Sequence, residues 1–103
     1  MGSRSESFRE KAISCPDNLL LQFSLGQALV EEGKESEALE PLRRCLDWKS
    51  DWMTPHILLG KCLIATGQEG PAESILREAL QLAIEQGHED PETEIRDLIA
   101  EIK

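Results

Sequence analysis

The side chains best suited to chemistry in this chain are its two histidines and the carboxylates beside the second one. His88 precedes Glu89 and Asp90, and imidazole and carboxylate groups are ligands that zinc accepts. Neither His56 nor His88 belongs to a His-x-x-x-His spacing, which would place two ligands on one helix face. Acidic residues at the start of a helix instead suit its positive end. We therefore predict no metal site and no cofactor.

Nucleophilic and phosphate-binding patterns are also missing. Cys15, Cys45 and Cys62 are odd in number, form no C-x-x-C pair and have no evident histidine partner. This usage predicts reduced thiols in a cytoplasmic protein, each a small buried residue. The turn at residues 67–70 lacks the Gly-Lys-Ser/Thr that completes a phosphate-binding loop. We therefore predict that the protein is not an enzyme.

Composition and charge restrict the class of partner. The 103 residues are 40% apolar and 30% charged, which is ordinary for one globular domain. The net charge of −9 opposes binding to nucleic acid or to anionic lipid, since both favour Lys and Arg surfaces. No apolar run approaches the ~18 residues of a membrane span. These properties predict a protein or peptide partner, without nucleic acid or membrane.

The elements that would position any site follow from an internal repeat. Residues 25–29 (LGQAL) recur as residues 59–63 (LGKCL), an offset of 34 residues. Other residues coincide at the same offset: Gly33 with Gly67, Glu35 with Glu69, Ala38 with Ala72, Leu42 with Leu76, Arg43 with Arg77 and Leu46 with Leu80. A period of this length is typical of stacked units that bury their apolar faces against one another.

Each unit is predicted to contain two helices, because apolar residues recur at helical spacings and no strand-like alternation persists. Gly33 is expected to end one helix in the left-handed conformation. Asp17, Ser36 and Thr54 are expected to cap the helices that follow them. Pro41 lies inside a predicted helix, where it costs ~3 kcal/mol or more, so a kink or an irregular first turn is expected.

These residues resemble the tetratricopeptide repeat, a helix-turn-helix of 34 residues with the pattern W-x2-L-G-x2-Y…A-x3-F…P. The Leu-Gly pair occurs at Gly26 and again at Gly60, and the alanine slot is filled in both units. The tryptophan slot departs from the pattern, since it holds Gln22 and His56. The closing proline slot also departs, because it holds Ser50 and Ile84.

The resemblance implies an all-α fold in which antiparallel helix-turn-helix repeats stack as a short right-handed α-solenoid of about six helices. Residues 1–103 form one domain. It begins with a half-repeat helix at 5–18, continues with repeats at 19–52 and 53–86, and ends with a capping helix at 90–103. The second helix of the second repeat is expected to be extended.

The resemblance also implies a concave groove lined by the first helix of each repeat. The residues carried over as its lining are Leu20, Phe23, Gln27, Val30, Glu31, Thr54, Ile57, Lys61, Ile64 and Ala65. The alternative is that the terminal helices cover this face, which would make its apolar residues part of the core. The carboxylate clamp of some family members is excluded, because Phe23, Gln27 and Leu58 stand where it needs Lys, Asn and Asn.

We therefore predict a protein–protein interaction module that binds a short peptide or helix of a partner. The alternatives are a homodimerisation unit, or an acidic adaptor or chaperone for a basic client. Trp48 and Trp52 flank the junction between the repeats. Exposed tryptophans often anchor interfaces, but we favour the interpretation that both fill the gap between the repeats.

Overall fold

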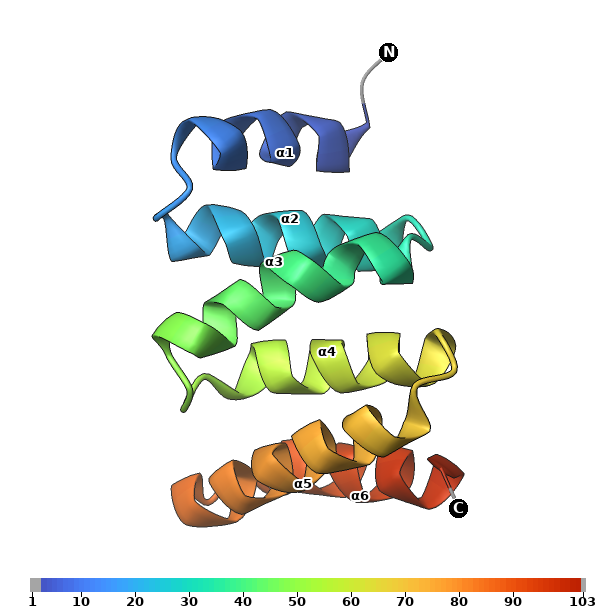
Figure 1. The fold of residues 1–103 in the computed structure, drawn as a ribbon. Coiled ribbons are helices and arrows are strands. Elements are labelled where there is room, and N and C mark those ends of the chain that lie inside the picture. The colour runs from blue at the N-terminus through green and yellow to red at the C-terminus, as the bar shows by residue number, and fades with distance from the viewer. Residues whose placement is uncertain (1–2, 103) are drawn as a thin grey trace.

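The computed structural model describes residues 3–102, which form six α-helices and no strand. The helices are α1 (Arg4–Ser14), α2 (Leu19–Glu31), α3 (Glu35–Trp48), α4 (Met53–Ala65), α5 (Glu69–Gln86) and α6 (Glu89–Ile102). Each helix packs against the next in the chain, and α4 also contacts α2 and α6. The result is an elongated stack with α1 at one end and α5 and α6 at the other (Figure 1). This confirms the predicted all-helical repeat fold.

Glycine allows the two helices of each pair to approach closely. A Cβ atom added to Gly26 would lie 2.8 Å from Leu42 Cδ2, and one added to Gly60 would lie 2.5 Å from Leu76 Cδ2. Both leucines are fully buried. The repeated Leu-Gly pair thus creates the same close contact twice, between α2 and α3 and between α4 and α5.

The turns inside the two pairs are also the same. Gly33 and Gly67 have φ angles of 76° and 78°, the left-handed conformation that glycine adopts at least cost. After each glycine, a backbone N–H returns to the preceding helix, from Lys34 to the Leu29 carbonyl and from Gln68 to the Leu63 carbonyl, both at 2.8 Å. The predicted ending at Gly33 is confirmed.

The predicted N-terminal caps are wrong by one or two residues. Asn18, not Asp17, caps α2, because its Oδ1 accepts the Leu21 N–H at 3.2 Å. Helix α3 begins at Glu35, before Ser36, and α4 begins at Met53, before Thr54. The third residue of α4 is Pro55, which is tolerated there because the first N–H groups of a helix have no intrahelical partner.

The last helix also begins one residue before its predicted start. Its first residue is Glu89, so Pro91 is its third residue, like Pro55 in α4. Pro41 lies well inside α3, yet the helix is continuous from Glu35 to Trp48 and Pro41 is buried. Burial of the proline ring against the neighbouring helices offsets the backbone hydrogen bond that proline cannot donate.

Two clusters of buried residues form the core. The first contains residues from each of the five helices α1 through α5, among them Ala12, Leu29 and Leu63. The second joins α4, α5 and α6, and includes Ile57 and Ile95. Helix α6 is therefore packed into the stack and shares a core with α4.

Candidate functional site

The α2 half of the predicted groove presents apolar side chains to solvent. Leu20 is 69% exposed, and Phe23 and Val30 are half-buried at the edge of the first core cluster. Gln27 lies between them along the helix and is half-buried too. The Phe23 ring packs on the Trp52 ring, with centroids 5.0 Å apart. We call Leu20, Phe23, Gln27 and Val30 the α2 face.

The α4 half is partly covered by α6. Ile57 is only 9% exposed and packs with the second core cluster. Lys61 Nζ lies 2.9 Å from Glu94 Oε2 of α6. Ile64 is half-buried and touches both clusters, while Thr54 and Ala65 are exposed. The alternative, in which a terminal helix covers the groove and buries its apolar residues, is therefore correct for Ile57. It is not correct for the α2 face, which is open.

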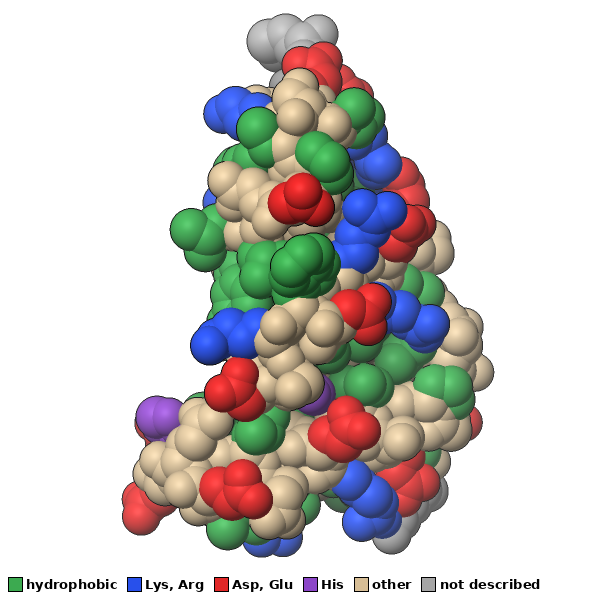
Figure 2. All heavy atoms as spheres, turned by 60° about the vertical axis from the view of Figure 1, so that its left-hand side comes forward, with side chains coloured by type: hydrophobic (Ala, Val, Ile, Leu, Met, Phe, Trp, Pro, Cys, Tyr) green, Lys and Arg blue, Asp and Glu red, His purple; other side chains and the backbone are tan. Residues whose placement is uncertain are grey.

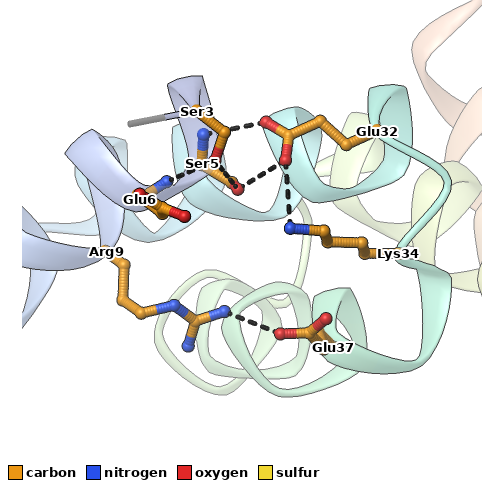
Figure 3. A network of polar contacts seen from close by, with 7 residues as sticks. All are labelled: Ser3, Ser5, Glu6, Arg9, Glu32, Lys34 and Glu37. Carbon is orange, nitrogen blue, oxygen red and sulfur yellow. Dashed lines mark hydrogen bonds and ion pairs between the residues drawn. The ribbon is translucent and has the colours of Figure 1, made fainter. Parts of the chain in front are cut away.

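Glu31 and Glu32, at the end of α2, hold α1 in place. The Glu32 carboxylate accepts the Ser5 backbone N–H at 2.9 Å and the Ser5 hydroxyl at 2.6 Å (Figure 3). The Ser5 side-chain hydrogen bond is the main cause that lowers the pKa of Glu32. Exposed Glu31 pairs with Arg4. Glu31 is thus engaged within the chain, at the opposite end of α2 from Leu20.

The two tryptophans differ in their surroundings. Trp52 is half-buried on Phe23 and fills the space between the repeats, as predicted. Trp48 is 68% exposed, so the same prediction is wrong for Trp48. It is the last residue of α3. Figure 2 shows hydrophobic side chains gathered near the middle of the face that it presents, with charged side chains around them.

The cysteines follow the prediction in two cases out of three. Cys45 and Cys62 are fully buried, and burial raises the pKa of each thiol to about 11. Such thiols are almost entirely protonated at neutral pH, which makes them poor nucleophiles. Cys15 is exposed, because it follows the last turn of α1, so its predicted burial is wrong.

Across residues 3–102, no group of three or more His, Cys, Asp and Glu side chains is arranged to hold a metal ion. In the same part of the chain, no helix is long and apolar enough to cross a membrane. His88, Glu89 and Asp90 are exposed at the beginning of α6.

The sequence did not predict a groove that lies between α3 and α5, on the side of α4 that faces away from Lys61. We call this side the back of α4. Two adjoining hollows form the groove, and both are lined by Leu46, Asp47 and Ile75. His56 lies in this groove, although it is only 3% exposed. The signal in the sequence was the departure at the tryptophan slot, where a smaller polar ring replaces the large apolar one.

Comparison with known proteins identifies the class. A TPR repeat-containing protein of Pseudomonas aeruginosa is 32% identical over 79 residues, which cover 77% of this chain and 75% of the relative. The solution structure of a Bordetella parapertussis protein matches with a TM-score of 0.81 at 25% identity, covering 99% of this chain and 89% of its own. No family model matches the chain.

A crystal structure of a tetratricopeptide repeat domain protein from Salinibacter ruber shares the fold, with a TM-score of 0.73 at 18% identity. The match covers 82% of this chain and 96% of that one. The repeated Leu-Gly contact, the matching glycine turns and these similarities agree. The chain belongs to the tetratricopeptide repeat proteins, and its residues 3–102 form two helix pairs with a single helix on either side.

Proposed function

We propose that the protein is a non-catalytic interaction module that binds a short apolar peptide or helix of a partner protein on the α2 face. The observation that carries the proposal is the exposure of Leu20 next to the half-buried Phe23. Apolar side chains left partly open on one helix face are typical of contact surfaces. Membership of the tetratricopeptide repeat family supports the same function.

The proposed contact continues onto α4 through Lys61 and Ile64, which keep part of their surface open. Ile57 contributes only from beneath, because α6 covers it. The open surface is therefore short, which favours a short ligand. We place the protein in the cytoplasm, because its three cysteines are free thiols, which persist in a reducing compartment.

The test begins with selection of short random peptides displayed on phage against the immobilised protein. An enriched peptide is then titrated against purified variants by calorimetry. Leu20→Glu should weaken binding by about tenfold or more, because it would place an unpaired carboxylate against an apolar ligand. Ile84→Glu is the matched control, since Ile84 is also exposed but lies on α5.

Equal affinity for the wild type and for Leu20→Glu would reject the α2 face as the site. Phe23→Glu with Ile64→Glu is a second variant, and its helicity must be checked by circular dichroism because both residues touch the core. Concentration-dependent sedimentation that Leu20→Glu abolishes would instead support the homodimer alternative. Enrichment of strongly basic peptides would support an acidic adaptor.

A further inference from the structure

The groove on the back of α4 lies between α3 and α5, whose backbones do not approach closely enough to close it in the described residues. Its floor is made by Leu59 and Leu63 of α4, and Leu46 and Ile75 from the flanking helices form its walls. Leu59 and Leu63 are four residues apart and so share one side of α4. Lys61 and Ile64 lie on the other side. The groove is therefore separate from the proposed α2 face.

His56 has an unusual hydrogen-bonding position in this groove. Its Nδ1 lies 2.9 Å from the Trp52 carbonyl oxygen. Because a carbonyl oxygen can only accept, Nδ1 carries the hydrogen, and Nε2 of the neutral ring is then an acceptor. Nε2 lies 3.6 Å from Glu78 Oε2, which is also an acceptor. In the protonated ring Nε2 pairs with Glu78 directly; in the neutral ring both atoms are acceptors, and one donor beside them can bond to both.

The surroundings of this acceptor pair are acidic. Glu78 is well exposed at the rim, and Asp47 lines the same hollow without forming an ion pair in the part of the chain that the structure describes. Arg43 lines only the adjoining hollow. The His56 end of the groove therefore combines an apolar wall with two carboxylates, which is complementary to an aliphatic chain that ends in a cation.

We propose that the groove between α3 and α5 binds a segment of a partner protein by one lysine side chain. The aliphatic stem packs on Leu46 and Ile75, and the ammonium donates to Glu78 and to Nε2 of His56. An ammonium has three donors, so it satisfies both acceptors at once. This site goes beyond the function proposed above, because it lies on another side of α4 and uses different residues.

The probe for this site is n-pentylammonium, which reproduces a lysine side chain, with n-pentanol as the uncharged analogue. Both are titrated into protein with labelled Leu and Ile methyl groups and followed by NMR. The ammonium should shift the Leu46 and Ile75 methyl signals saturably and bind about tenfold more tightly than the alcohol, because its hydrogen bonds involve charged groups. The Leu20 methyl signals, which report on the α2 face, should not shift.

Glu78→Gln should remove the preference for the ammonium over the alcohol. Glu85→Gln is the matched control, because it removes the same charge from α5 outside the groove and should keep the preference. His56→Gln should reduce the preference in part. Glutamine is expected to be tolerated there, because Gln22 fills the same slot of the first repeat and is buried in it.

Three results would overturn the proposal. One is equal binding of the ammonium and the alcohol by the wild type. Another is an unchanged preference in Glu78→Gln. The third is a set of methyl shifts in the groove that grows with protein concentration when no probe is present, which would identify a second copy of the chain as the occupant. None of these results bears on the α2 face, so the two proposals fail independently.

Discussion

At the scale of single residues, the close approach of paired helices depends on the absence of one methyl group. A Cβ atom at Gly60 would meet Leu76 Cδ2 at 2.5 Å and Leu76 Cγ at 2.7 Å. Leu76 is fully buried, so it has little space into which to move. By contrast, a Cβ atom at Gly70, in the first turn of α5, would meet nothing within 4 Å.

We therefore expect Gly60→Ala to lower the free energy of unfolding by ~1–3 kcal/mol, the usual cost of an overpacked core. Urea unfolding followed by circular dichroism measures the change. Gly70→Ala is the control and should be neutral or stabilising by up to ~1 kcal/mol, because alanine is the better helix former. A stable Gly60→Ala protein would show that α4 and α5 are not packed at this distance.

His56 marks the limit of prediction at this scale. The sequence shows that His56 occupies a slot where the family pattern has tryptophan, but not which atoms it meets. The Trp52 carbonyl selects the hydrogen-bearing nitrogen of the His56 ring, and α5 brings Glu78 opposite the other nitrogen. Trp52 lies only four residues before His56, so that contact is local, whereas Glu78 is brought to the ring by the packing of α5 on α4, which no spacing rule could have found.

At the scale of elements, α1 packs mainly on α2, and polar groups supply much of its attachment. Ser5 and Glu32 form the central contact, and Arg9 pairs with Glu37 of α3 at 3.1 Å. Phe8 and Ala12 add apolar contacts. The helix itself was predictable from its apolar spacing, but its attachment through Glu32 was not, because 27 residues separate Ser5 from Glu32.

The attachment of α1 should depend on pH. The pKa of Glu32 is lowered below its usual 4.5 in the folded protein, because the Ser5 hydroxyl and N–H stabilise the carboxylate. A lowered pKa means that the contribution of Glu32 to stability is complete above about pH 4.5 and is lost as pH falls through the folded value. NMR signals of Phe8 and Ala12 should therefore report loosening of α1 in this acidic range.

Glu32→Gln provides the comparison for this prediction. At neutral pH it should already show loosened α1 signals, and acid should change them less than in the wild type. Glu10→Gln removes one carboxylate from the exposed side of α1 and should behave like the wild type. Identical acid titrations of the wild type and Glu32→Gln would show that another group holds α1.

At the scale of the whole molecule, α6 packs on the second helix pair. Two complete helix pairs are fewer than the roughly three units that repeat proteins generally need. Helix α6 supplies Ile95, which is fully buried, and Ile99, which is 9% exposed, and both pack with Ile57. At the other end of the described residues, α1 packs on α2.

Deletion of residues 91–103 should therefore unfold the protein or make it oligomerise, because it exposes Ile57 and the apolar side of α5. Light scattering after size-exclusion chromatography and circular dichroism distinguish the two results. The milder variant Ile95→Ala should cost ~2–5 kcal/mol, as for other buried large-to-small changes. Arg96→Ala, an exposed neighbour, should change stability by less than ~0.5 kcal/mol. A folded, monomeric deletion variant would contradict this account.

The sequence by itself determined the repeat, the helices and the glycines between them, because these depend on local conformation and on a period of 34 residues. It also placed Leu20, Phe23 and Val30 on one helix face. Only the tertiary structure decided that α6 covers Ile57, that Trp48 is exposed, and that α3 and α5 leave a groove over His56. The physical reason is that burial depends on which helices meet, and those contacts join residues far apart in the chain.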